Sequence, residues 1–251
     1  DGIALIPTII ELQKNQILNY IKTKKKCSLN HLSKKYNANN GYLNVALRLL
    51  CSQGLLEQSI TNNEVFFSNL TIDNWISTNA LKKYKIVEKL YYHKINYDII
   101  SNHNIENENQ SSILFNILNN YNNWKEEENY KLINLKQLEK WEIHIEGAIL
   151  GPIIVHLGRK DLFKNIKKNE RLILNINKDW IKLIMKVFYN TNIVNEKNEL
   201  TEYGYFLLKR ATSYGVTVSY LPTFRNLKKL FYGDHSELTE KSDKKEEIHV
   251  D

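Results

Sequence analysis

The sequence is poor in glycine, and its glycines stand too far apart to form a phosphate-binding loop. There are nine glycines among 251 residues, and no two lie closer than four positions. This spacing excludes both the P-loop and the Gly-x-Gly turn that lets a backbone approach a dinucleotide or S-adenosylmethionine. The alternating βα pattern that carries such loops is also missing.

Cysteine is nearly absent as well. Cys27 and Cys51 lie far apart and form no Cys-x-x-Cys pair, which excludes a disulfide framework and argues against a zinc site. We expect both to be buried free thiols. The longest apolar run, GAILGPIIVHLG, is well short of a membrane span, and the N-terminus does not resemble a signal peptide, so we expect a cytoplasmic protein.

Catalytic patterns are also missing. The seven histidines form no His-Glu-x-x-His pair, and His144 and Glu146 would lie about 200° apart on a helix, so one metal could not readily bind both. His156 and the other histidines are expected to be core or surface residues. Ser213 and Ser219 stand outside any Gly-x-Ser-x-Gly elbow. The sequence therefore predicts no self-sufficient active site, no bound cofactor and no metal.

An internal repeat is the most informative feature that is present. DGIALIPTIIEL at residues 1–12 aligns with EGAILGPIIVHL at residues 146–157, with Gly, Leu, Pro, Ile and Leu in register. Pro7 and Pro152, two of only three prolines, share this register. We expect two related apolar helices that each open a module.

The residues after the first repeat predict a winged helix-turn-helix. Ser28 can cap one helix, and Asn39 or Asn40 can start another that presents Leu43, Leu47 and Leu50 on one side and ends at Gly54. LLEQSITNNEVFFS then alternates and turns at Asn62-Asn63, which predicts a β-hairpin wing.

A shorter version follows the second repeat. NKDWIKLIMKVFYNTN predicts the third helix, with Trp180, Ile184 and Val187 or Phe188 on one side. A wing with its turn at residues 196–198 follows, and Thr201 caps a last helix that we expect to end at Gly215. The fold class predicted is mainly α, with tandem winged-helix modules at residues 1–75 and 141–233, a helical connector at 76–140, and a linker at 234–251.

A winged helix also fits a DNA-binding regulator, whose third helix reads the major groove. The first module offers Asn40, Asn44 and Arg48, and the run KTKKK at residues 22–26 could touch phosphates or be a solvated helix end. The net charge of +7 fits an acidic partner, although only five of the 35 basic residues are arginines. Asp179 at the head of the second such helix disfavours DNA. DNA binding is kept as the alternative function, beside a third, a stand-alone adaptor.

Three stretches, EGAILGPIIVHLG, LTEYGYFLLKRATSYGVTVSYLPTF and LFYGDHSEL with EEIHVD, resemble the winged-helix and lid region that precedes S-adenosylmethionine-dependent methyltransferase domains, especially those of bacterial polyketide synthases. The resemblance implies a non-catalytic lid or dimerisation region over the substrate pocket of a downstream Rossmann-like domain. That domain would bind S-adenosylmethionine and would follow residue 251. It is a partner on this interpretation, together with an acyl carrier protein that bears the acyl group.

The resemblance also implies which residues line the lid. Tyr203, Tyr205, Tyr214 and Tyr220 would supply rigid amphipathic surface, Gly215 would supply a bend, and Arg210 would meet an acyl or phosphopantetheine group. Two alternatives stay open from the residues themselves. The tyrosines could fill the core of the second module, and Arg210 could cap the C-terminus of its helix.

Overall fold

The computed structural model describes residues 2–69, 78–101, 108–131, 140–160 and 166–233. Contacts group the chain into two compact units. Unit 1 comprises residues 1–88 together with the chain from residue 219 onward, and unit 2 comprises residues 89–218. The boundaries of the predicted modules stay a prediction, because a grouping by contacts is a different kind of division.

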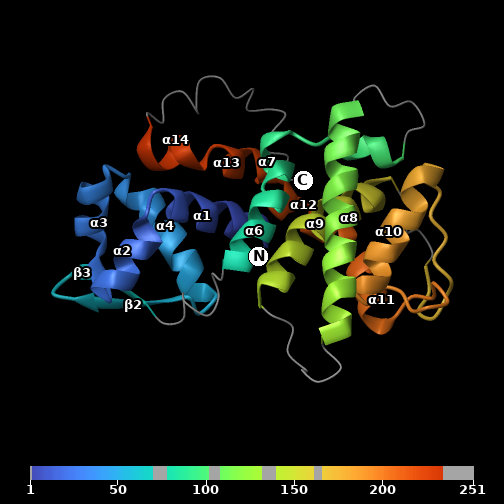
Figure 1. The fold of residues 1–251 in the computed structure, drawn as a ribbon, viewed down its shortest axis with the longest axis horizontal. Coiled ribbons are helices and arrows are strands. Elements are labelled where there is room, and N and C mark those ends of the chain that lie inside the picture. Colours follow the sequence, from blue (N-terminus) through green and yellow to red (C-terminus); the bar gives the residue numbers. More distant parts are fainter. Residues whose placement is uncertain (1, 70–77, 102–107, 132–139, 161–165, 234–251) are drawn as a thin grey trace. The chain divides into compact units, whose positions relative to one another are not determined.

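Unit 1 is built from short helices and one small sheet (Figure 1). Its helices are α1 (Gly2–Lys14), α2 (Ile17–Lys24), α3 (Leu29–Tyr36), α4 (Asn40–Ser52), α6 (Thr78–Val87), α13 (Leu221–Arg225) and α14 (Leu227–Tyr232). Its strands are β1 (Lys26–Ser28), β2 (Leu56–Thr61) and β3 (Glu64–Asn69), in the order β1-β3-β2 and antiparallel throughout.

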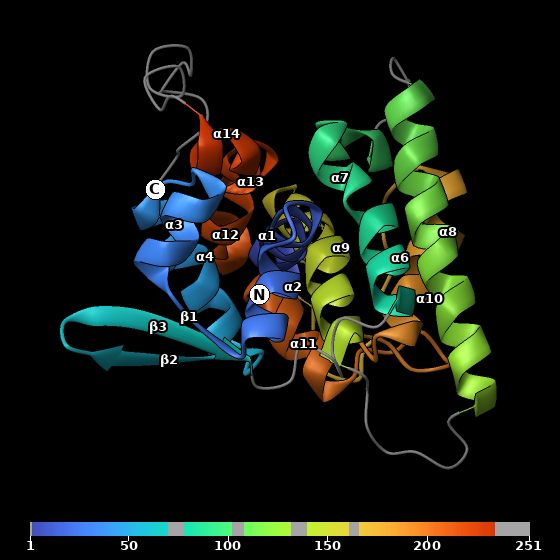
Figure 2. The same ribbon diagram turned by 60° about the vertical axis from the view of Figure 1, so that its left-hand side comes forward.

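The predicted wing is confirmed. β2 and β3 form a hairpin that extends away from α2, α3 and α4 (Figure 2), with Thr61 opposite Glu64. Asn62 and Asn63 both have positive φ, at 50° and 61°, as a tight type I′ turn requires. Sequence reasoning missed β1, whose three residues pair with Phe66, Phe67 and Ser68.

The helix boundaries of unit 1 follow from local hydrogen bonds. The Ser28 hydroxyl accepts from the amide of His31, and the Asn39 side chain accepts from the amide of Tyr42. At the end of α4, Gly54 has φ +73°, and the amides of Gly54 and Leu55 donate to the carbonyls of Cys51 and Leu50. This is the Schellman arrangement, so the predicted caps and stop are confirmed.

The core of unit 1 gathers the apolar faces of its helices. Leu43, Leu47 and Leu50 of α4 are fully buried, as predicted. Helix α1 packs against α2, α4, α6, α13 and α14, which explains why it is apolar on nearly all sides. Cys27 is buried as expected, but Cys51 is only half-buried.

Unit 2 is almost entirely helical. It contains α7 (Lys89–Tyr92), a 3₁₀ turn η1 (Tyr97–Ile100), α8 (Glu108–Lys131), α9 (Lys140–Arg159), α10 (Lys178–Asn190), α11 (Glu202–Lys209), a second 3₁₀ turn η3 (Ala211–Tyr214) and most of α12 (Gly215–Ser219). Where a wing was predicted, the described residues form only the single bridges Arg171 to Glu199 and Val194 to Leu200.

Helix α10 is amphipathic in the predicted way. Trp180, Ile184, Val187 and Phe188 are all buried, and α10 packs along α8, where the ring of Phe115 meets that of Trp180 edge to face at 5.8 Å. The Thr201 hydroxyl accepts from the amide of Gly204 and caps α11, as predicted. In the turn before it, Asn198 has φ 61°.

The two repeat segments are both helices with an internal proline. Pro7 lies inside α1 and Pro152 inside α9, and the aligned pairs Leu5 and Leu150, and Leu12 and Leu157, are all buried. The alignment therefore marks equivalent helices in the two units.

One predicted boundary is wrong. Helix α11 ends at Lys209, not at Gly215, because the chain tightens into η3 at Ala211. Gly215 has φ −57° and starts α12, so it adopts an ordinary helical conformation and provides no left-handed bend. An added Cβ would lie 3.4 Å from the guanidinium of Arg159, an ordinary contact, so packing does not require glycine here either.

Candidate functional site

The predicted lid residues begin on α11, which presents two aromatic rings to solvent. Tyr203 and Phe206 are 48% and 47% exposed, although they belong to the same short helix that buries Leu208. They lie three residues apart, so they share one face of the helix. This face is an exposed apolar surface on unit 2.

Tyr205 and Arg210 engage neighbours within the same helix. The ammonium of Lys209 lies 3.4 Å from the Tyr205 hydroxyl and above its ring. The guanidinium of Arg210 lies 4.4 Å from the centre of the Phe206 ring, and Arg210 is the C-cap residue of α11. Arg210 therefore lies at the C-terminal end of α11, the position that the helix-capping interpretation requires. Its side chain is exposed.

The other predicted residues divide between the two units. Tyr214 in η3 is half-buried, and Gly215 is buried against α9. Gly158 of α9 allows η3 to approach, because a Cβ there would lie 2.6 Å from that of Ala211. Tyr220 is 45% exposed and belongs to unit 1, so contacts group it apart from the tyrosines of unit 2.

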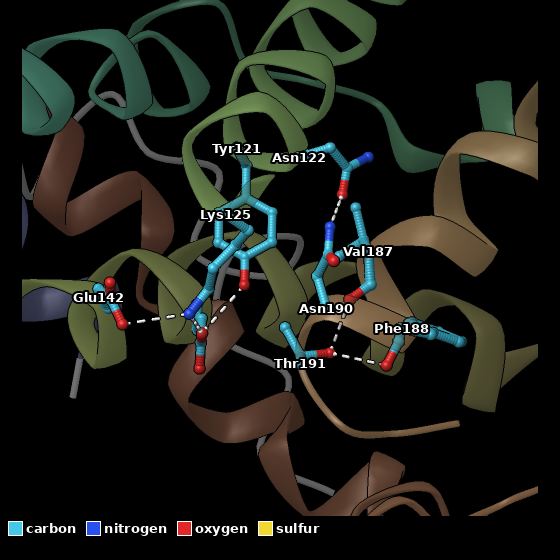
Figure 3. Close-up of polar contacts among 9 residues, drawn as sticks. Tyr121, Asn122, Lys125, Glu142, Val187, Phe188, Asn190 and Thr191 are labelled. Carbon is cyan, nitrogen blue, oxygen red and sulfur yellow. Dashed lines mark hydrogen bonds and ion pairs between the residues drawn. The ribbon is translucent and has the colours of Figure 1, made fainter. Parts of the chain in front are cut away.

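A buried ion cluster lies beside this surface, between α8 and α9 (Figure 3). The ammonium of Lys125 lies 3.1 Å from a carboxylate oxygen of Glu142 and 2.9 Å from one of Glu146. The Tyr121 hydroxyl donates to Glu146 at 2.9 Å. Glu142 is only 3% exposed, so its charge lies in a poorly hydrated place, where the ammonium of Lys125 stabilises it.

The charges of this cluster shift the pKa of Lys125 and also that of Tyr203 on the aromatic surface. Burial lowers the pKa of Lys125, but Glu146 and Glu142 raise it by more, so the net pKa is raised and the ammonium stays charged. The pKa of Tyr203 is raised by partial burial of its ring, by the negative charge of Glu146 and by Tyr214. Tyr203, Tyr214 and Glu146 therefore lie within electrostatic reach of one another.

Amide side chains continue the polar layer between α8 and α10 (Figure 3). Asn190 donates to the side-chain oxygen of Asn122 at 2.8 Å, and Asn122 is completely buried. The Thr191 hydroxyl donates back to the carbonyl of Val187 and caps the end of α10. The bond between Asn190 and Asn122 joins the two helices, whereas the Thr191 bond stays within the end of α10.

A shallow cavity of about 260 Å³ opens at the other end of the same helix pair. Its lining includes Glu108 and Phe115 from α8 and Asp179 and Trp180 from α10. Two carboxylates beside two aromatic rings suit a cationic or neutral guest better than a phosphate. No candidate residue of the sequence prediction lines it.

Sequence reasoning missed the ion cluster because its members look ordinary one by one. The available signal was a double i, i+4 spacing, with Tyr121 and Lys125 on one helix and Glu142 and Glu146 on another. Among the described residues there is no group of three His, Cys, Asp or Glu side chains that could hold a metal ion. The contacts of the cluster orient the Tyr121 hydroxyl and balance the buried charges of Lys125 and Glu142.

The helix that would read DNA in unit 1 is poorly suited to that task. Along α4, Tyr42 and Val45 are 39% and 66% exposed, and Arg48 is the one cation. The side-chain oxygen of Asn44 is buried without a hydrogen-bond partner, so it cannot reach a base edge. No helix in the part of the chain that the structure describes is long and apolar enough to cross a membrane.

Two family models match the chain. Residues 1–58 match the AprA N-terminal domain, which covers α1 to α4 and the start of β2. Residues 146–234 match the AprA winged helix domain, which covers most of α9 and the elements through α14. No curated protein sequence matches the chain significantly.

Proposed function

We propose that the chain is the non-catalytic lid and dimerisation region of an S-adenosylmethionine-dependent methyltransferase of a polyketide synthase. It would cover the substrate pocket of a downstream Rossmann-like domain that acts on a carrier-bound acyl group. The single observation that carries this proposal is the pair of AprA matches in one chain, which is consistent with a region associated with a polyketide synthase.

The surface chemistry supports a lid. Tyr203 and Phe206 offer rigid apolar area with a phenol group, and Arg210 adds a cation beside them. Such a surface can cover an acyl chain and its thioester without performing chemistry on it. The glycine spacing, which excludes a nucleotide loop in this chain, is consistent with cofactor binding by a different domain.

The test uses the complete natural gene product that contains these 251 residues, beside the 251-residue chain alone. We expect the gene product to bind S-adenosylmethionine in calorimetry and to transfer a labelled methyl group to a carrier-bound acyl thioester. We expect the chain alone to do neither. Absence of S-adenosylmethionine binding by the gene product would overturn the proposal, and salt-dependent binding of duplex DNA would favour a regulator instead.

The lid surface is tested within the same gene product. Tyr203→Ala with Phe206→Ala should raise KM for the acyl substrate about tenfold, which corresponds to the loss of roughly 1.4 kcal/mol of apolar contact. The affinity for S-adenosylmethionine should not change. Tyr189→Ala is the matched control, because Tyr189 is 46% exposed on α10 of the same unit. Equal effects of the two variants would contradict a lid at α11.

A further inference from the structure

The positive charge of the protein is concentrated in one segment. Residues 12–56 contain no aspartate or glutamate, yet they hold eight basic side chains: Lys14, Lys22, Lys24, Lys25, Lys26, Lys34, Lys35 and Arg48. The whole chain has a net charge of only +7, so the rest of it is close to neutral. A charge distribution this uneven creates a local positive field on unit 1.

The fold gathers six of these lysines along α2, β1 and α3. Lys22 and Lys24 lie in the last turn of α2, Lys25 and Lys26 lead into β1, and Lys34 and Lys35 end α3, and all six are exposed. The Tyr36 hydroxyl donates to the carbonyl of Gln16, so the end of α3 lies against the start of α2. The lysines therefore stand at both ends of one two-helix surface.

Aromatic rings fill the middle of this surface. Tyr20 stacks on His31 with ring centres 5.7 Å apart and meets Tyr36 edge to face at 6.0 Å. The ammonium of Lys35 lies 4.7 Å from the centre of the Tyr20 ring. This contact restricts the Lys35 side chain before any partner binds, so less conformational entropy is lost when an anion binds. We call these six lysines with Tyr20, His31 and Tyr36 the basic–aromatic face.

Helix-end stabilisation explains only part of this pattern. Lysines in the last turn favour the negative end of the helix dipole, which accounts for Lys22, Lys24, Lys34 and Lys35. It also covers Lys25, the C-cap residue of α2, but it does not account for Lys26 in β1 or for the absence of any carboxylate over residues 12–56. An acidic partner accounts for the lysines at the helix ends, for Lys26 and for the missing carboxylates.

We propose that the basic–aromatic face is the docking surface for an acidic protein, the acyl carrier protein of the same synthase. The identity of this partner rests on the proposed function, whereas the preference for an acidic protein does not. Lysine point charges suit scattered carboxylates, while bidentate recognition of phosphates and bases favours arginine. The neighbouring α4 exposes Tyr42 and Val45 instead of cations, which fits a protein interface with an apolar part better than a nucleic-acid groove.

The test measures binding of the complete gene product to a purified phosphopantetheinylated acyl carrier protein of net negative charge. The variant Lys24→Glu, Lys34→Glu, Lys35→Glu should weaken binding at least tenfold and flatten its dependence on salt. The control Lys178→Glu, Lys182→Glu, Lys197→Glu reverses three exposed lysines of unit 2 and should change affinity less than twofold. The variant with glutamine at positions 24, 34 and 35 repeats the test without reversed charge at the helix ends.

Equal effects of the face and control variants would overturn the proposal. The proposal would also be overturned if the gene product did not bind the acyl carrier protein but bound a 20-base-pair DNA duplex through the same lysines. Methyl transfer to a free acyl-pantetheine thioester separates this inference from the proposed function. The face variant should retain that activity, because no carrier protein takes part in it.

Discussion

The two segments for which we predict winged-helix modules are stabilised differently. In unit 1 the wing is a complete hairpin whose strand β3 also pairs with β1. In unit 2 the corresponding segment forms only two single bridges. Instead, unit 2 keeps the ion cluster of Lys125, Glu142 and Glu146 and the buried amide of Asn122 between its helices.

The aligned helices α1 and α9 show the same contrast. Position 11 of α1 is a glutamate that accepts from Asn15, just past the end of the same helix, whereas the aligned position of α9 is His156, which contacts Ser101 and Asp98 at η1. Backbone pairing orders the periphery of unit 1, and side-chain polar contacts between elements order unit 2. A repeated sequence motif therefore specifies a buried helix in each unit, but it does not specify the polar contacts that join this helix to neighbouring elements.

The largest expected effect comes from the core of each unit. Trp180→Ala in α10 should cost about 3–5 kcal/mol and Leu47→Ala in α4 about 2–5 kcal/mol, because both side chains are buried. Hydrogen exchange should show lost protection confined to the unit that carries the substitution. If each substitution lowered protection in both units equally, the comparison of two separate units would fail.

The ion cluster should matter far more than a surface ion pair. Lys125→Ala removes the ammonium that faces the buried carboxylate of Glu142 and should destabilise unit 2 by about 3–5 kcal/mol. Lys186→Ala in the same unit removes a contact to Glu126 in which the two side chains are 40% and 52% exposed, and it should cost about 0–1 kcal/mol. Urea unfolding measures both, and similar values would show that burial does not distinguish them.

The raised pKa of Lys125 adds a pH dependence to the same experiment. The folded state holds this proton more tightly than the unfolded state, so the stabilisation is complete below the unfolded pKa of about 10.4. It should be lost as the pH rises through the higher folded value. The Lys125→Ala variant should lack this alkaline loss.

A substitution at Gly204 tests how closely α11 packs against the backbone at Ile193. A Cβ at this position would lie 2.0 Å from the carbonyl oxygen of Ile193, so Gly204→Ala must displace backbone and should cost at least about 1–3 kcal/mol. Gly41→Ala in α4 of unit 1 is the control, since its Cβ would meet only the Asn39 side chain at 3.4 Å. Thermal unfolding should show a lower Tm for the first variant alone.

The smallest effect should be an acid sensitivity specific to unit 2. Burial lowers the pKa of His156, Lys160 and Arg159 lower it further, and the nearby Asp98 only partly opposes them. The unfolded state therefore binds the proton more readily, and stability should fall as the pH drops below about 6.5 toward the folded pKa. His156→Gln should flatten this slope, measured by unfolding between pH 7 and pH 5. An unchanged slope would assign the acid response to other groups.

Local features of the fold could be predicted from the sequence, and non-local ones could not. Ser28, Asn39, Gly54 and Thr201 act within a few residues of themselves, so their caps and stops are visible in the sequence. Strand β1 pairs with residues some forty positions away, and a three-residue strand has too little pattern to detect.

The candidate site was predictable only in part for the same reason. The aromatic richness of α11 was visible, but which rings face solvent depends on what α9 and η3 cover. The neighbourhood of Glu146 joins α8, α9 and α11, and no spacing within one segment specifies such a meeting. Gly215 was wrongly predicted to end α11 and to bend the chain, because a glycine can also take an ordinary helical φ, here −57°.

The division of unit 1 into two chain segments has a consequence for protein synthesis. Helices α13 and α14 cover α1, and the amide of Asn39 bonds to the carbonyl of Phe231, yet these partners follow all of unit 2 in the sequence. During synthesis on a ribosome, α13 and α14 therefore emerge on the order of ten seconds after α1, because all of unit 2 is translated in between. During that interval the apolar side of α1 is open to chaperones, and unit 2, although second in the chain, can finish folding first.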